Sequence, residues 1–104
     1  MVTIVKNKEG GVDFSIVTES GKTLVKGTGL TNESDVRTLI DRMSAQQERF
    51  YKVARKTDHN GRFHFSVLDK EGSLIAQSGT YGSEAGMENG IKNFKNSIAQ
   101  LGPS

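Results

Sequence analysis

The side chains of this chain best suited to catalysis are a histidine and a serine. His64 and Ser66 are two residues apart in an alternating apolar segment, so both side chains are expected on one face of a strand. An imidazole could activate the hydroxyl, but the sequence places no carboxylate to orient the imidazole and contains no nucleophile elbow. His59, the other histidine, lies in an expected turn. We therefore predict no catalytic site and no enzyme activity.

A metal or cofactor site is not expected either. The chain has no cysteine, which excludes thiolate ligands, and its two histidines lack the spacing of a metal motif. The segment Gly27-Thr28-Gly29 lacks the third glycine of a dinucleotide fingerprint and the strand–loop–helix order of a phosphate loop. We predict that the protein uses no cofactor and holds no metal.

A basic segment in the middle of the chain is a candidate surface for nucleic acid. Its cationic residues are Arg49, Lys52, Arg55, Lys56 and Arg62. Phe50 and Tyr51 are interleaved with them, so the segment could follow a phosphate backbone and stack bases. The alternative is a solvated edge strand, whose lysines and arginines discourage pairing with another chain. Because the formal net charge is only +2, we favour the edge strand.

The elements that position these side chains follow an internal repeat. Gly21 and Gly72 are 51 positions apart, and sliding the chain by that offset superimposes one half on the other without a gap. The superimposed pairs include Gly10/Gly61, Phe14/Phe65, Ile16/Val67, Val36/Met87, Ile40/Ile91 and Met43/Phe94. Because the apolar residues stay in phase, we infer a tandem duplication. The chain is then one domain, residues 1–104, made of a divergent first repeat (1–49) and a second repeat (50–104).

Each repeat is predicted to form three strands and a helix. Period-two alternation predicts central strands over residues 12–17 and 63–68, flanked by strands near 3–6, 23–28, 50–56 and 73–80. Helical spacing from Val36 to Met43 and from Met87 to Ile98 predicts two amphipathic helices, the second ended by Gly102-Pro103. The predicted fold is α+β, with two tandem β-β-β-α repeats forming one antiparallel sheet. Both helices lie on one face, residues 45–49 link the halves, and a pseudo-twofold axis relates them.

The start of the second helix carries a motif of the form Tyr-x-Ser-x-x-Gly-x-x-Asn-Gly-Ile. Its positions are filled by Tyr81, Ser83, Gly86, Asn89, Gly90 and Ile91. In this the chain resembles the YegP-like family of small uncharacterised proteins. The resemblance implies a β-β-β-α unit that occurs in tandem or as paired subunits, one continuous sheet, and no established activity. In the first repeat only Ile40 preserves a motif position.

The motif has a structural and a functional interpretation. Glycines inside a helix cost about 1 kcal/mol each relative to alanine, so Gly86 and Gly90 require a compensating contact. We favour close approach of the helix to the sheet or to its twin helix, with Asn89 bonded to backbone at the junction between the repeats. The alternative is a cradle for a small ligand or peptide near Tyr81, with Asn89 as its polar anchor.

The sheet face opposite the helices is the last candidate surface. It is expected to be polar except for Val17 and Leu68, which occupy equivalent places in the two repeats and could hold a homodimer or a protein partner. Because no apolar run approaches the ~20 residues of a membrane span, we expect a soluble, cytoplasmic protein that does not bind membranes. We predict a non-catalytic protein-interaction or self-associating module. Weak nucleic-acid binding and small-ligand binding are the alternatives.

Overall fold

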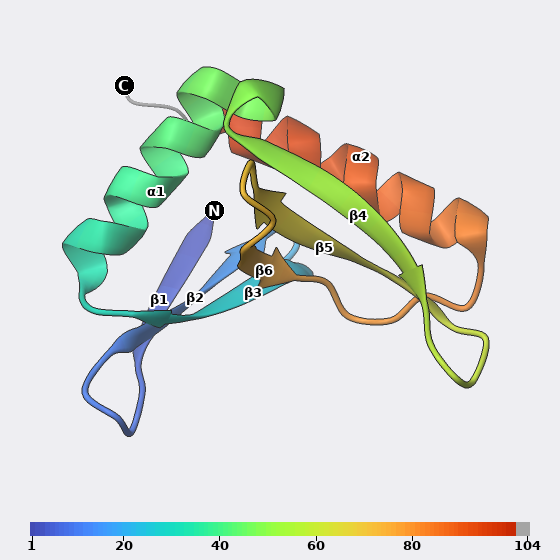
Figure 1. Cartoon of the computed structure of the whole chain (residues 1–104), viewed down its shortest axis with the longest axis horizontal. Coiled ribbons are helices and arrows are strands. Elements are labelled where there is room, and N and C mark those ends of the chain that lie inside the picture. Colours follow the sequence, from blue (N-terminus) through green and yellow to red (C-terminus); the bar gives the residue numbers. More distant parts are fainter. Residues whose placement is uncertain (102–104) are drawn as a thin grey trace.

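Six strands form one antiparallel sheet in the order β1-β2-β3-β6-β5-β4 (Figure 1). The strands are β1 (Val2–Lys6), β2 (Val12–Val17), β3 (Thr23–Leu30), β4 (Tyr51–Thr57), β5 (Phe63–Asp69) and β6 (Leu74–Gln77). Helix α1 (Glu33–Gln46) and the 3-10 turn η1 (Gln47–Arg49) connect β3 to β4, and helix α2 (Glu84–Gln100) follows β6. The computed structural model describes residues 1–101, so the expected stop at Gly102-Pro103 lies outside the described residues. The predicted α+β fold with one antiparallel sheet and two helices is confirmed.

Both helices begin at side-chain caps. The Asn32 side chain accepts a hydrogen bond from the Asp35 N–H at 3.0 Å, and the Ser83 hydroxyl accepts one from the Gly86 N–H at 3.0 Å. Each cap satisfies one of the backbone donors that the first turn of a helix leaves unpaired. The caps therefore fix where the apolar stripe of each helix starts.

The core lies between the helices and one face of the sheet. Alternate residues of β2 and β5 are buried there, led by Phe14 and Phe65, which are 2 % and 0 % exposed. They meet the apolar stripes of α1 and α2, and both helices lie on the same side of the sheet (Figure 1). Phe94 of α2 packs against Phe65 with ring centroids 6.0 Å apart. One continuous core therefore holds both halves of the chain together.

The structure departs from the sequence-based boundaries in two places. Residues 45–49, expected to link the halves, are the end of α1, which continues to Gln46, and the turn η1, which begins at Gln47 with a φ of 49°. Strand β6 ends at Gln77 rather than near residue 80. The reason is Ser78, whose hydroxyl accepts a hydrogen bond from the Phe65 N–H at 2.9 Å and donates one to the Gly79 carbonyl at 2.7 Å.

Candidate binding site

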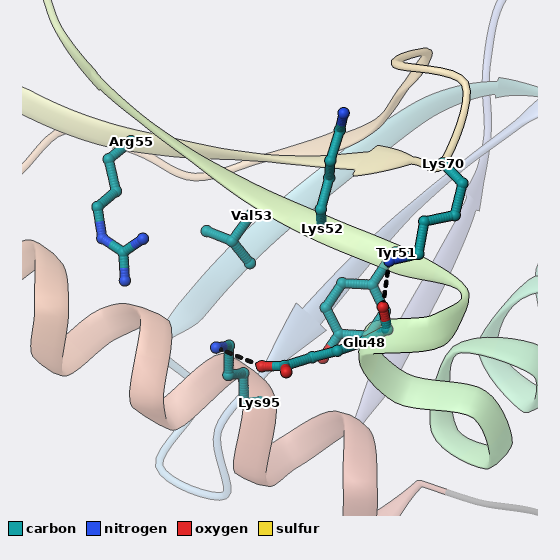
Figure 2. Close-up of a pocket in the computed structure, with 7 residues that line it drawn as sticks. All are labelled: Glu48, Tyr51, Lys52, Val53, Arg55, Lys70 and Lys95. Atoms are coloured by element: carbon teal, nitrogen blue, oxygen red, sulfur yellow. Dashed lines mark hydrogen bonds and ion pairs between the residues drawn. The ribbon is translucent and has the colours of Figure 1, made fainter.

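A cavity of about 320 Å³ lies between β4, η1 and α2 (Figure 2). Its lining residues are Glu48, Tyr51, Lys52, Val53, Arg55, Lys70 and Lys95. Most of them come from β4, and α2 supplies Lys95 from the opposite wall. We call this cavity the β4–α2 groove.

The outer edge of β4 is one end of the sheet. The direction of its backbone groups follows from the neighbouring strand, because hydrogen-bonded and non-bonded pairs alternate along antiparallel strands. Phe63 of β5 exchanges both backbone hydrogen bonds with Tyr81, at 2.9 and 2.7 Å, so its N–H and C=O point away from β4. Thr57, which lies opposite Phe63, therefore directs its own N–H and C=O outward. The backbone groups of Arg55, Val53 and Tyr51 also point outward, because these residues lie two, four and six positions before Thr57.

The side chains of β4 alternate in the same way. Tyr51, Val53 and Arg55 face α2, whereas Lys52 and Lys56 belong to the open face of the sheet. In Figure 2 the Val53 side chain points toward α2 and the Lys52 side chain points away from it. The residues that line the groove with their side chains are thus the ones whose backbone groups point outward from the edge.

Ion pairs cross the groove from β4 and η1 to α2. Arg55 binds Glu88 through two hydrogen bonds of 2.5 and 3.0 Å, and Lys95 binds the Glu48 carboxylate at 2.8 Å. The hydrogen bond from Arg55 lowers the pKa of the Glu88 carboxyl, and the one from Lys95 lowers the pKa of Glu48. Lys70 donates to the Glu48 backbone carbonyl and closes this end of the groove.

The groove concentrates positive charge. Its lining residues include the cations Lys52, Arg55, Lys70 and Lys95, of which Lys52 directs its side chain to the open face, and the carboxylate of Glu48, while Glu88 adds a second carboxylate beside Arg55. With Lys52 set aside, three cations face two carboxylates across the groove, an excess of one, and Lys52 and Lys56 add positive charge on the open face beside the same edge. The groove is therefore suited to an anionic partner.

Tyr51 forms the buried floor of the groove. It is 1 % exposed, and its ring meets Phe94 edge to face with centroids 5.6 Å apart. Burial, together with the charge of Glu48, raises the pKa of the Tyr51 hydroxyl. The buried Tyr51 ring is therefore not available to stack bases, and Phe50 is likewise partly buried against the core.

The structure does not gather the basic segment on one surface. Arg55 faces the groove, Lys52 and Lys56 are exposed on the open sheet face, Arg49 lies in η1, and Arg62 lies in the turn before β5. A nucleic-acid backbone could therefore not meet all five cations along one strand face.

The motif packs around a tyrosine ring. Tyr81 lies against Gly90, where a β-carbon would overlap the phenol, whereas a β-carbon at Gly86 would meet the Tyr81 ring at an ordinary 3.7 Å. The ring is stacked beside Phe65, with centroids 6.4 Å apart and planes 18° apart. The expectation that the glycines let the helix approach the sheet or the twin helix is therefore wrong at Gly90, because the neighbour there is the side chain of Tyr81.

The remaining motif residues have separate roles. Ser83 caps α2 and Ile91 belongs to the core, at 3 % exposure. Asn89 is exposed, so the expectation that it bonds to backbone at a buried junction is wrong. Asn89 lies on the solvent-facing side of α2, between the partly buried Glu88 and the buried Gly90.

The residues expected to be exposed on the open sheet face are partly or fully buried. Val17 and Leu68 are half-buried, and β3 and β6 lie between their strands. Ser66 is 3 % exposed and does not form part of an accessible polar surface beside His64. Within residues 1–101, no three of the histidines and acids gather as metal ligands. No helix in this range is long and apolar enough to cross a membrane.

Known proteins share this fold. The family described as "Domain of unknown function (DUF1508)" matches residues 58–100. A UPF0339 protein of Pseudomonas aeruginosa is 24% identical over 99 residues, covering 95% of this chain and 90% of that protein. The E. coli protein of unknown function yegP, solved by NMR, matches with a TM-score of 0.68 and 23% identity, covering 97% of this chain and 84% of that chain. This chain resembles the yegP protein in fold.

A second NMR structure extends the YegP-like comparison. A UPF0339 protein of Shewanella oneidensis matches with a TM-score of 0.76 and 19% identity, covering 94% of this chain and 83% of that chain. The family match over residues 58–100 includes the whole tyrosine–glycine motif, whereas strand β4 of the groove ends at Thr57, just before it. The YegP-like relatives supply the fold and name no activity.

Proposed function

We propose that this YegP-like protein is a non-catalytic interaction module that binds an acidic polypeptide segment in the β4–α2 groove. The observation that carries the proposal is the excess of cations along a strand edge whose backbone groups point outward. An edge of this kind offers hydrogen bonds to another polypeptide, and its charge selects which polypeptide is accepted.

The ion pairs in the groove are exposed enough for a carboxylate of a partner to replace the carboxylates of the protein. The side chains of Arg55 and Glu88 are 50% and 43% exposed, and those of Lys95 and Glu48 are 39% and 72% exposed. Exposed ion pairs are worth little, because water already solvates both charges. A partner carboxylate can therefore share or replace Glu48 and Glu88 at small cost. Rim charges of this type mainly guide the encounter and fix its register.

We also propose that the fold is a tandem duplication with a pseudo-twofold axis between β3 and β6. Turns that are 51 positions apart support it. The Asn7 side chain accepts from the Gly11 N–H at 3.0 Å, and the Asp58 side chain accepts from the Arg62 N–H at 2.9 Å. The glycines of these two turns, Gly10 and Gly61, have φ of 87° and 75°. The strand order is itself symmetric about the β3·β6 pair.

The later turn of each half supports the duplication as well. The Thr18 hydroxyl accepts from the Lys22 N–H at 3.1 Å, and the Asp69 carboxylate accepts from the Ser73 N–H at 2.9 Å. These acceptors and donors are again 51 positions apart. Thr18 and Asp69 thus hold equivalent turns through different side chains, as expected for two copies that have diverged in sequence.

Self-association is the alternative within the same class. Neither edge strand, β1 with sequence VTIVK or β4 with sequence YKVARKT, contains an acidic residue, so two copies could not complement one another edge to edge. Contact through Val17 and Leu68 would leave the β4–α2 groove unused. The variant Val17→Lys with Leu68→Lys would dissociate such a dimer in sedimentation experiments. Under our proposal this variant binds acidic peptide as the unmodified protein does.

Small-ligand binding near Tyr81 is less well supported. The ring of Tyr81 occupies the space above Gly90, so the position that a ligand would take against the helix is filled by the protein itself. Asn89 is exposed on α2 and would anchor a ligand only on the outside of the helix.

Fluorescence anisotropy with a labelled peptide of alternating glutamate and threonine tests the proposed function. The variant Lys52→Glu with Lys95→Glu should weaken binding by about tenfold or more, since each 1.4 kcal/mol is a factor of ten. The control Lys8→Glu with Lys22→Glu carries the same net charge at exposed sites outside the groove and should bind almost normally. Circular dichroism checks that both variants are folded.

Three results would overturn the proposal. Both double variants losing binding equally would show a general charge effect rather than a groove. A lysine–threonine peptide binding as well as the acidic one would remove the charge argument. Salt-dependent binding of single-stranded DNA without binding of the acidic peptide would favour the nucleic-acid alternative.

A further inference from the structure

We infer that the acidic segment binds as a seventh strand, added to the outer edge of β4. This inference rests on the proposed function and specifies the conformation and side-chain pattern of the partner. It starts from the coincidence that Tyr51, Val53 and Arg55 direct backbone groups outward and side chains toward α2. An extended segment lying on this edge would bond to the backbone and to the groove at the same time.

The backbone part of the site is already set by the pairing of β4 with β5. Lys52, Ala54 and Lys56 lie opposite Leu68, Ser66 and His64. These are the β5 residues that alternate with Phe63 and Phe65, so their backbone groups bond to β4. The intervening residues of β4 are left with outward donors and acceptors. Within the described chain, residues 1–101, no strand pairs with that outer side.

The charges of β4 determine which strand can be added. Lysines on an edge usually prevent pairing, because they repel the basic or neutral edges of other chains. An acidic strand converts the same lysines into attractive cross-strand pairs. A second copy of this chain cannot supply such a strand, since its own edges, β1 and β4, contain no acid. The occupant is therefore an acidic segment of another polypeptide.

An antiparallel partner would carry a definite pattern. Successive partner residues would lie opposite Lys56, Arg55, Ala54, Val53 and Lys52. The first and fifth would face the lysines on the open side, and the second would face Arg55 in the groove. The fourth would pack on Val53. The geometry thus favours acids at the first, second and fifth positions and an apolar residue at the fourth.

Two N-methylated forms of one peptide test strand addition. The parent is a blocked Thr-Glu-Glu-Thr-Val-Glu-Thr peptide. One form is methylated on the backbone nitrogens of the odd-numbered residues, and the other on those of the even-numbered residues. In an added strand only one set of N–H groups faces β4. That form should lose affinity by about a hundredfold because two or three hydrogen bonds are lost. The other form should stay within about threefold of the parent, because its methyl groups point to solvent.

Amide hydrogen exchange gives an independent readout on the protein. In the complex with the parent peptide, exchange at Val53 and Arg55 should slow by about tenfold or more, because their N–H groups gain partners. Ala54 is the internal control, since its N–H already bonds to β5.

The outcomes separate this inference from the proposed function. If both methylated forms bind like the parent while Lys52→Glu with Lys95→Glu still abolishes binding, the groove binds acid but not as a strand. Unchanged exchange at Val53 and Arg55 in the saturated complex would overturn strand addition in the same way. If the parent peptide does not bind at all, both the inference and the proposed function are wrong.

Discussion

Tyr81 lies so close to the backbone of Gly90 that a β-carbon at Gly90 would overlap the phenol oxygen. This contact explains why a glycine stands in the middle of α2, where it weakens the helix. The loop before α2 is held at the same point by the bridge between Tyr81 and Phe63. The motif therefore joins the start of β5, the loop and the helix into one packed unit, next to the strand that forms the groove.

Neighbouring residues of α2 should respond to alanine with opposite signs. Gly90→Ala forces Tyr81 to move and should lower the free energy of unfolding by about 1–3 kcal/mol. Asn89→Ala, at the exposed position one residue earlier, should raise it by a few tenths of a kcal/mol, because alanine is the better helix former. Urea denaturation of the two variants measures both effects.

A double variant identifies the cause of the Gly90 effect. If the added methyl group acts through Tyr81, then Gly90→Ala should cost less in a Tyr81→Ala background than in the natural protein. Equal costs in both backgrounds would mean that Tyr81 is not the neighbour that the methyl group displaces. A large loss of stability for Asn89→Ala would contradict its placement on the exposed side of the helix.

The proposed duplication predicts equal costs at equivalent core positions. Ile40 of α1 and Ile91 of α2 are 51 positions apart and are 5 % and 3 % exposed. Ile40→Val and Ile91→Val should each lower the free energy of unfolding by about 0.5–1.5 kcal/mol. Chemical denaturation measures the two losses, and Ile75→Val, at a half-buried position of β6, should cost less. Strongly unequal losses at Ile40 and Ile91 would argue against equivalent packing in the two halves.

The groove ion pair predicts a pH dependence of stability. Arg55 holds the pKa of Glu88 below its ordinary value of 4.5. The pair therefore stabilises the fold fully above that value, and its contribution is lost as the pH falls through the lower, folded-state pKa. Glu88→Gln should be less stable than the natural protein at neutral pH and equally stable in acid below that pKa. Denaturation at both pH values measures this difference.

The pKa itself can be followed by NMR titration of the Glu88 carboxyl. In an Arg55→Gln variant it should rise back toward 4.5, the ordinary value for this group. A Glu88 carboxyl that titrates identically with and without Arg55 would show that the ion pair does not persist in solution.

The sequence predicts most of the fold because its patterns are local. The alternation around Phe14 and Phe65 predicts the central strands, and the helical spacing from Val36 to Met43 and from Met87 to Ile98 predicts the two helices. The offset of 51 predicts that Gly10 and Gly61 serve equivalent turns, and both have positive φ. Hydrophobic periodicity and turn chemistry act over a few residues, so they can be recognised without a structure.

The groove could not be predicted, because its contacts are distant in sequence. Arg55 and Glu88 are 33 residues apart, and Lys95 and Glu48 are 47 apart. From the sequence, the segment around Tyr51 looks like a basic, aromatic surface. In the structure the Tyr51 ring is buried against Phe94 of α2. Alternation shows which β4 side chains share a face, but which of them meet Glu88 and Lys95 depends on how α2 packs on the sheet.

An NMR titration with the acidic peptide tests the central claim most directly. Backbone amide signals of the natural protein are followed while the blocked Thr-Glu-Glu-Thr-Val-Glu-Thr peptide is added. Our account predicts saturable shifts concentrated at Val53, Arg55 and Lys95, with little change at Val17 and Leu68 on the open sheet face. Shifts centred on Val17 and Leu68, or no shifts at a large excess of peptide, would contradict it.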